Sequence, residues 1–185
     1  MALTTVASVK AFMGLTGTSA DAVLAELITQ LSAQVDNFCQ RTLGRADHSH
    51  WIDGSGGTRL LLTEWPVVAV SLVQVNGVSI PAAADPVSQG YRFFDAGELL
   101  LNPGGQRFTR GQRNVRVDFT AGYTDNQVPA DLALACNRMV ANMYRARDWT
   151  GYVSKSLAGE TVTFRDEMEK DSVRSVLWNY RRVTP

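Results

Sequence analysis

The sequence predicts an α+β fold that is mainly helical, with a helical bundle core, an inserted small antiparallel β-sheet and a C-terminal helical tail. Two observations predict this class. Apolar residues recur every three or four positions over residues 20–42 and 129–147, whereas apolar and polar residues alternate between these stretches. The 185 residues fit a single domain. Within it we expect residues 1–47 as N-terminal helices, 48–119 as the β-sheet insertion, 128–148 as the core helix and 149–185 as the C-terminal tail and helix.

The N-terminal part is expected to hold two helices. Residues 4–13 form a short amphipathic helix that stops at Gly14. A longer helix follows, with Thr18 or Ser19 as its cap and Gly44 as its C-terminal stop. Its buried stripe is expected to contain Leu24, Leu27, Ile28, Leu31, Val35 and Phe38.

The middle of the chain is expected to form short antiparallel strands. Asn76-Gly77, the preferred pair for a two-residue hairpin turn, joins strands at residues 67–75 and 78–80. A second hairpin is expected around residues 95–97, and the remaining strands at residues 58–62 and 115–119. Together these segments predict a small sheet.

The C-terminal part returns to helical spacing. Gly122 suits a turn with positive φ, and Pro129 suits a first helical turn, where a missing N–H costs nothing. The helix over residues 129–147 should bury Leu132, Cys136, Met139, Val140 and Met143. A strand at residues 161–164 and a last helix over residues 166–182 are expected beyond it.

The composition is that of an ordinary folded protein, with 45% hydrophobic and 19% charged residues. Because 18 basic residues balance 18 acidic ones, no net field draws the chain to nucleic acid or to an anionic membrane. The N-terminus lacks the features of a signal peptide, and no apolar run approaches the ~20 residues that span a bilayer. We therefore expect synthesis inside the cell and no membrane partner.

Metal-binding chemistry has one candidate. His48 and His50 are the only histidines and alternate on a strand, so both could reach one ion with Asp47 or Asp53. No further Cys or His lies nearby, which favours a solvent-exposed start of a strand over a metal site. We predict no metal and no cofactor.

The two cysteines, Cys39 and Cys136, lie on different predicted helices. Since cytosolic thiols stay reduced, they are interpreted as small buried side chains, with a disulfide or a metal site as the alternatives.

The glycine-rich segment Gly54-Ser55-Gly56-Gly57-Thr58 is similar to a phosphate-binding loop only in its glycines. It lacks the lysine of that motif and precedes a strand where the motif requires a helix. Ser55 is also outside the strand-to-helix turn that presents a nucleophilic serine. We interpret the segment as a flexible hairpin loop, and we expect no enzymatic activity.

A basic run, Arg107, Arg110, Arg113 and Arg116, lies in or next to a polar segment at residues 104–114. It is either a solvated loop or a loop tip that meets DNA phosphates. We select Arg107, Arg110 and Arg113 as candidate DNA-facing residues.

The C-terminal tail is rich in aromatic residues, which are enriched as anchors of protein interfaces. The candidate interface residues there are Trp149, Tyr152, Trp178, Tyr180, Arg181 and Arg182.

With these segments in view, the chain resembles the head-tail connector, adaptor or head completion proteins of tailed bacteriophages and related prophages. The resemblance rests on the order of five segments. They are Val35-Asp36-Asn37-Phe38-Cys39-Gln40-Arg41-Thr42-Leu43, Trp65-Pro66-Val67, Val75-Asn76-Gly77, Val117-Asp118-Phe119-Thr120-Ala121-Gly122-Tyr123 and Val128-Pro129-Ala130-Asp131-Leu132.

The resemblance implies a structural virion protein at the head-tail interface. It implies a homo-oligomeric ring, twelvefold in the virion, that docks under the portal protein and extends the channel for genomic double-stranded DNA. The ring would also offer an attachment surface to a downstream tail-completion or stopper protein. The tail residues selected above would then contact the portal or a neighbouring subunit.

Two other functions fit parts of the sequence. A small nucleic-acid-binding module using residues 107–116 predicts salt-sensitive binding to free DNA. A metal hydrolase centred on His48, His50 and Asp53 predicts metal-dependent activity.

Overall fold

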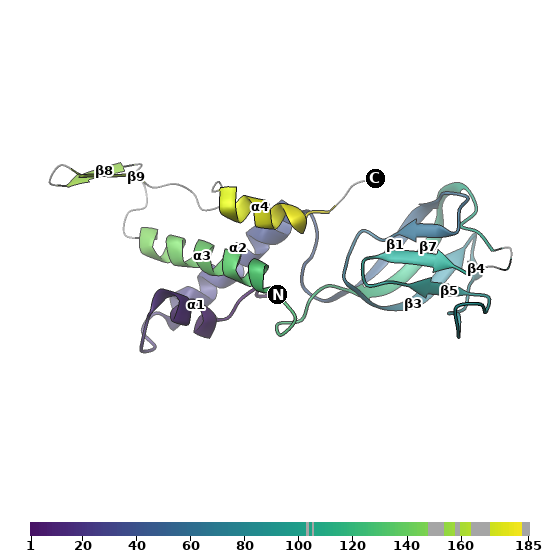
Figure 1. Cartoon of the computed structure of the whole chain (residues 1–185), viewed down its shortest axis with the longest axis horizontal. Coiled ribbons are helices and arrows are strands. Elements are labelled where there is room, and N and C mark those ends of the chain that lie inside the picture. The colour runs from purple at the N-terminus through teal and green to yellow at the C-terminus, as the bar shows by residue number, and fades with distance from the viewer. Residues whose placement is uncertain (103, 105, 148–153, 158–159, 164–170, 183–185) are drawn as a thin grey trace. The chain divides into compact units, whose positions relative to one another are not determined.

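The computed structural model describes residues 1–102, 104, 106–147, 154–157, 160–163 and 171–182 (Figure 1). These residues form two compact units. The helical unit contains Met1–Gln40 and Asp125–Arg181, and the β unit contains Arg41–Thr124 together with Arg182. Along the sequence, the β unit is therefore inserted into the helical unit.

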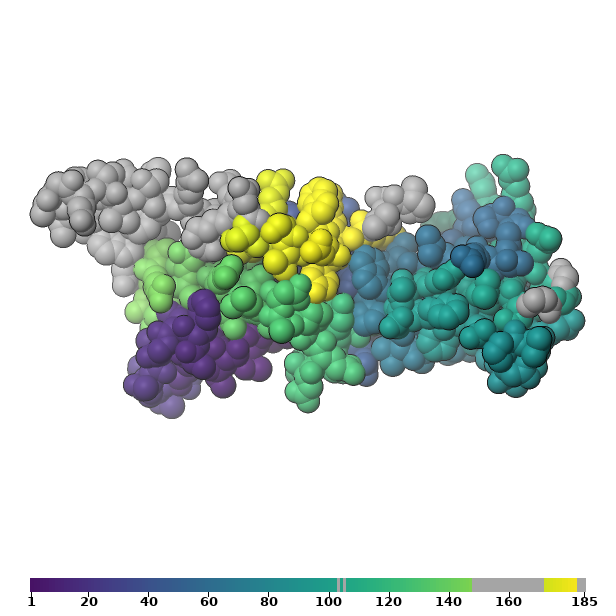
Figure 2. All heavy atoms as spheres, in the orientation of Figure 1, coloured from purple at the N-terminus to yellow at the C-terminus, as the bar shows by residue number. Residues whose placement is uncertain are grey.

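The helical unit packs α1 (Val6–Met13), α2 (Asp21–Cys39), α3 (Ala130–Ala146) and α4 (Asp171–Asn179) against one another (Figure 1). α1 begins where the Thr5 side chain accepts a hydrogen bond from the Ser8 N–H (3.2 Å) and ends at Gly14, whose φ of 70° is left-handed. Figure 2 shows atoms of α4 (yellow) lying directly against atoms of α3 (green).

The core of the helical unit follows the predicted apolar stripes except at Leu27 and Phe38, which are only half-buried. Three polar residues, Thr4, Ser32 and Asn137, are also buried in this unit. Asn137 lies on α3. Its Oδ1 accepts a hydrogen bond from the Thr4 hydroxyl (2.6 Å), and its Nδ2 donates one to Ser8 Oγ (3.0 Å). Met143, predicted to be buried, is 46% exposed. The buried apolar residues are Leu3, Val9, Leu24, Ile28, Leu31, Val35, Cys39, Leu132, Ala135, Cys136, Met139, Val140, Ala141, Val173 and Leu177.

The β unit contains two antiparallel sheets. The larger has the order β1-β7-β3-β4, and the smaller the order β2-β6-β5. Their strands are β1 (Ala46–Gly54), β2 (Arg59–Leu61), β3 (Val67–Val75), β4 (Val78–Ser79), β5 (Tyr91–Phe93), β6 (Glu98–Leu101) and β7 (Gly111–Ala121). Both predicted hairpins are confirmed: Asn76 and Gly77 have φ of 50° and 79° between β3 and β4, and β5 pairs with β6.

The two sheets share one hydrophobic core. Alternate residues of β7, namely Val115, Val117, Phe119 and Ala121, point into it because side chains alternate between the faces of a strand. The remaining members are Leu60, Leu62, Val67, Val73, Val75, Ile80, Tyr91, Leu99, Leu101 and Phe108.

The prediction of a mainly helical fold is wrong: the chain has a β-rich α+β fold. The insertion was expected to be a small sheet attached to a helical bundle, but its strands form two sheets that enclose their own core. The physical reason is strand length. β7 extends over Gly111–Ala121, where the alternation predicted only residues 115–119, and β1 pairs with it along nearly its whole length.

Three predicted boundaries also differ. α2 ends at Cys39 rather than near Gly44, because Gln40 already adopts a left-handed conformation (φ 55°). α2 has no side-chain cap, since Ala20 occupies the position expected for Thr18 or Ser19. The last helix covers Asp171–Asn179 of the predicted residues 166–182, of which 166–170 lie outside the described residues.

Two further segments complete the described chain. α3 begins at Ala130, one residue later than predicted, with Pro129 as its N-terminal cap residue rather than its first helical residue. The strand predicted near residue 161 pairs with one that the sequence did not indicate: β8 (Ser154–Leu157) and β9 (Glu160–Thr163) form an antiparallel hairpin. No helix in the described part of the chain combines the length and apolar character needed to cross a membrane.

Candidate functional site

The predicted basic segment lies at one end of the β unit, where it is anchored by a buried aromatic ring. Phe108 is 0% exposed and belongs to the core, although it lies between arginines in the sequence. Its backbone pairs with the glycine-rich segment: Gly56 N–H donates to Phe108 O (2.6 Å), and Phe108 N–H donates to Gly57 O (2.9 Å). The flexible hairpin loop expected at residues 54–58 is therefore a bonded connection between strands of different sheets.

Asn114 joins three loops at the same end of the β unit. Its Oδ1 accepts the Gly54 N–H (2.9 Å), and its Nδ2 donates to Thr109 O (2.7 Å) and to Asn76 Oδ1 (3.1 Å). The Asn76 amide in turn donates to the Thr109 hydroxyl (2.7 Å). These bonds hold the basic segment against the Asn76-Gly77 turn and the glycine-rich segment.

Three arginines, Arg107, Arg110 and Arg113, carry the positive charge of this segment, and all are exposed. Arg107 Nη1 lies 3.5 Å from Gly56 O, and a Cβ placed on Gly56 would lie 3.9 Å from the Arg110 Cβ. The Arg113 N–H donates to Asp53 Oδ1 (2.7 Å). Among the described residues, none of these guanidinium groups forms an ion pair, so all three can meet an anion. We call Arg107, Arg110 and Arg113 the arginine segment.

Arg116 differs from the other arginines of the run. Its Nε and Nη2 bind both carboxylate oxygens of Asp118 (3.1 and 2.9 Å), so its charge is neutralised on the outer face of the larger sheet. A hydrogen bond from Ser49, followed by the bond and charge of Arg116, holds the pKa of Asp118 below its ordinary value. The Arg116 guanidinium lies 5.9 Å from the ring centre of Trp51, which is 52% exposed.

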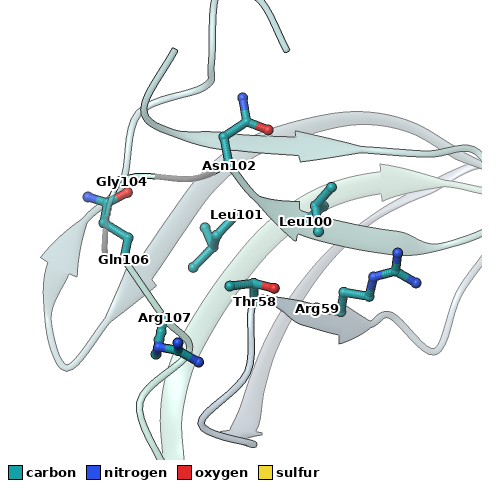
Figure 3. A pocket seen from close by; sticks show the side chains of 8 residues that line it. All are labelled: Thr58, Arg59, Leu100, Leu101, Asn102, Gly104, Gln106 and Arg107. Carbon is teal, nitrogen blue, oxygen red and sulfur yellow. The ribbon is translucent and has the colours of Figure 1, made fainter. Parts of the chain in front are cut away.

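A pocket of about 450 Å³ lies beside the arginine segment. Figure 3 shows its lining residues, with Arg107 and Arg59 on either side of Thr58. The residues come from the start of β2, the end of β6 and the connection that leads to β7. They are Thr58, Arg59, Leu100, Leu101, Asn102, Gly104, Gln106 and Arg107.

Two hydrogen-bonding side chains in the pocket differ in their partners. Asn102 is 2% exposed, and its Nδ2 donates to Asp85 O (3.0 Å) and Ser88 O (2.8 Å), so it holds the loop before β5. The Gln106 Oε1 is buried and accepts no hydrogen bond from the part of the chain that the structure describes.

The sequence predicted that the two histidines lie at a solvent-exposed start of a strand. In the structure both are half-buried on β1. The rings of His48 and His50 each lie 5.3 Å from the ring of Phe119, between centres. Burial lowers the pKa of both imidazoles; the charge of Asp47 acts in the opposite direction on His48, whereas His48 and Arg182 lower the pKa of His50 further. No group of three or more His, Cys, Asp or Glu within the described ranges could hold a metal ion.

Cys39 and Cys136 are both buried, as predicted for small apolar side chains. Burial raises the pKa of the Cys136 thiol to about 12, and the neighbouring charges of Cys39 and Asp36 act in the same direction. A thiol with this pKa is protonated at neutral pH and is a poor nucleophile.

The candidate interface residues of the tail are placed only in part. Trp178 is 54% exposed at the end of α4, and the Arg181 guanidinium lies 4.8 Å from its ring centre. The Tyr180 hydroxyl donates to Asp131 Oδ1 of α3 (2.7 Å), and Arg182 follows in the β unit. Trp149 and Tyr152 lie outside the described residues.

Sequence reasoning missed Arg59 and Gln106 as site residues. Arg59 lies opposite Leu100 in the register between β2 and β6, some forty positions away along the chain. No local sequence pattern could indicate that Arg59 and Leu100 lie side by side, whereas the run of arginines is visible in the sequence itself.

Comparisons with known proteins found one matching family and several structures of similar fold. A family model described as "Head completion protein" matches residues 2–183. Three solved structures have a similar fold, each covering 97% of this chain and 89% of the other. They are described as the neck of an empty GTA particle computed with C6 symmetry (TM-score 0.58, 20% identity), the neck of a native GTA particle computed with C12 symmetry (0.56, 19%) and the virion of a native gene transfer agent particle (0.57, 21%). No curated protein matches.

Proposed function

This chain belongs to the head completion protein family and is a structural protein of the virion's head-tail region; from that premise, we propose that its copies form a ring under the portal protein. The ring extends the channel for double-stranded DNA and presents a surface to the next tail-completion protein. The observation that carries the proposal is the family match over residues 2–183, which spans both units. The likeness to neck structures computed with C6 and C12 symmetry supports a ring, twelvefold in the virion.

Within this function, the exposed aromatic end of α4 is the proposed contact with the portal or a neighbouring subunit. Trp178 is 54% exposed and stacks with Arg181, a combination typical of interface anchors. Tyr180 is tied to Asp131 of α3, so the end of α4 is held on the helical unit. The sequence also selects Trp149, Tyr152 and Arg182 as candidates for contact with the portal or a neighbouring subunit.

The arginine segment is the proposed DNA-facing part of the ring. Its three guanidinium groups have no carboxylate partner among the described residues, so they are available to phosphates. A DNA channel is expected to make few phosphate contacts. Each contact adds affinity for DNA and makes log K fall by about 0.9 for every tenfold rise in salt concentration. A lumen lined by many basic residues would therefore retain the genome.

Electron microscopy of the purified protein, with and without the portal protein of the same particle, tests the ring. We expect rings of twelve copies on the portal. Trp178→Ala should reduce portal binding, whereas Trp51→Ala, a change at a similarly exposed tryptophan of the β unit, should not. Failure to assemble with the portal at any concentration would contradict the proposal.

The exposed arginines also favour a second function, that of a small DNA-binding module. Replacing Arg107, Arg110 and Arg113 with glutamine should then abolish tight, salt-sensitive binding of a 20-base-pair duplex by the isolated protein. In the ring proposal, the wild-type protein binds this duplex only weakly. Submicromolar binding at physiological salt without any self-association would therefore favour the second function.

A further inference from the structure

The outer face of the smaller sheet carries an excess of positive charge around its pocket. Arg59 of β2 and Arg92 of β5 both lie opposite Leu100 of β6, so the three side chains share one face of the sheet. Arg107 adds a third cation at the edge of the pocket. Glu98, 3.3 Å from Arg59, is the one carboxylate on the described strands of this sheet. A ligand of this face is therefore expected to be anionic.

The same face also carries apolar side chains, and these favour one kind of anionic ligand over another. Leu61, two residues after Arg59 on β2, is 71% exposed, and Leu100 lines the pocket. A phosphodiester backbone offers no apolar side chain to cover these leucines. A protein segment can supply carboxylates and aliphatic side chains together.

The backbone of β2 favours an extended peptide. β2 is the last strand in the order β2-β6-β5, so no strand among the described residues pairs with its other edge. An edge strand presents unpaired N–H and C=O groups to which a peptide can add as a further strand. Side chains two residues apart on such a peptide lie about 6.6 Å apart on one face, as Arg59 and Leu61 do on β2.

We propose that the pocket and the edge of β2 bind an extended acidic segment of a partner protein. One carboxylate of the segment pairs with Arg59 and Arg107, and an aliphatic side chain two positions away covers Leu61. The pairing of a carboxylate with arginine is a strong, charge-assisted contact, and the alternation of acidic and aliphatic residues supplies the specificity. This binding does not depend on ring formation.

The test uses the full chain and a fluorescein-labelled peptide of sequence Glu-Thr-Leu-Thr-Glu-Thr-Leu-Thr, with a lysine-for-glutamate peptide and a 20-base-pair duplex as further probes. Fluorescence anisotropy gives the affinities, and backbone amide shifts of Arg59–Leu61 locate the contact. We expect the acidic peptide to bind and the lysine peptide not to bind. Arg59→Glu should weaken binding at least tenfold, because it replaces an attraction with a repulsion.

Arg110→Glu is the matched control, since it makes the same charge change on an exposed arginine outside the pocket lining. It should change the affinity for the peptide less than threefold. Unchanged peptide binding in Arg59→Glu, an equal loss in Arg110→Glu or no amide shifts with millimolar peptide would each overturn the proposal. Duplex binding that is lost in Arg59→Glu, without peptide binding, would make the pocket a nucleic-acid site instead. Ring formation on the portal is measured separately, so either proposal can fail alone.

Discussion

Replacing Phe108 with alanine is expected to destabilise the β unit by about 3–5 kcal/mol, the range found when a fully buried phenylalanine is truncated. The ring is 0% exposed and belongs to the core shared by both sheets. Its removal loses the transfer free energy of the ring and leaves a cavity, because the surrounding strands cannot close over it completely. Urea denaturation of the full chain measures the loss.

The same substitution should loosen the arginine segment. The Phe108 backbone is bonded to both Gly56 and Gly57, so a mobile residue 108 weakens the connection that supports the arginines. Hydrogen exchange of the Gly56 and Phe108 amides should become faster in Phe108→Ala. Phe108→Leu keeps an apolar side chain and is expected to show a smaller effect of the same kind, should the alanine variant fail to fold.

Phe93→Ala provides the control, because Phe93 is a phenylalanine of the same unit that is 38% exposed. It should cost about 1 kcal/mol or less, as expected for a partly exposed site. Equal urea midpoints for Phe108→Ala and Phe93→Ala would refute the reasoning, and so would unchanged amide exchange at Gly56.

Three further predictions concern other buried groups. Asn137→Ala should destabilise the helical unit by about 1–3 kcal/mol in urea denaturation, because it removes the partner of the buried Thr4 hydroxyl; a loss below 0.5 kcal/mol would contradict this. Since burial lowers the pKa of His48 in the folded state, the unfolded state binds more protons below pH 6.5, and stability should fall as the pH decreases from 7 to 5. His48→Phe should reduce that fall, and a pH dependence equal to that of the wild type would contradict the assignment. The Cys136 thiol, with a pKa of about 12, should react with a thiol reagent at pH 8 only after denaturation; rapid labelling of the native protein would show that it is accessible.

Local sequence signals predicted the elements whose stabilising contacts join residues that are close in the sequence. The Asn76-Gly77 pair specifies a turn with two positive φ values, and the structure has it. The apolar stripe of α3 specified a helix whose bounds differ from the prediction by one residue at each end. In both cases the interactions that decide the structure lie within one turn of helix or one hairpin.

Long-range pairing decided the parts that were not predicted. β1 pairs with β7 from Ala46↔Ala121 to Gly54↔Gly111, so Gly111 lies in a strand although its sequence neighbours are arginine and glutamine. Phe108 is buried for the same reason: the glycine-rich segment folds over its backbone. A polar composition around these residues indicated a loop, and no pattern in the sequence revealed which distant strands would meet.

The ends of the inserted segment have a consequence for how the chain folds. Within the β unit, Arg45 N–H donates to Tyr123 O (2.8 Å) and Tyr123 N–H donates to Leu43 O (2.8 Å), so the chain enters and leaves the β unit at adjacent positions. Without these two hydrogen bonds, bringing α2 and α3 together would close a loop of roughly 90 residues at an entropic cost of about 4 kcal/mol. A β unit that folds first reduces the loop to a few residues, and the two halves of the helical unit then meet as if they were neighbours in sequence.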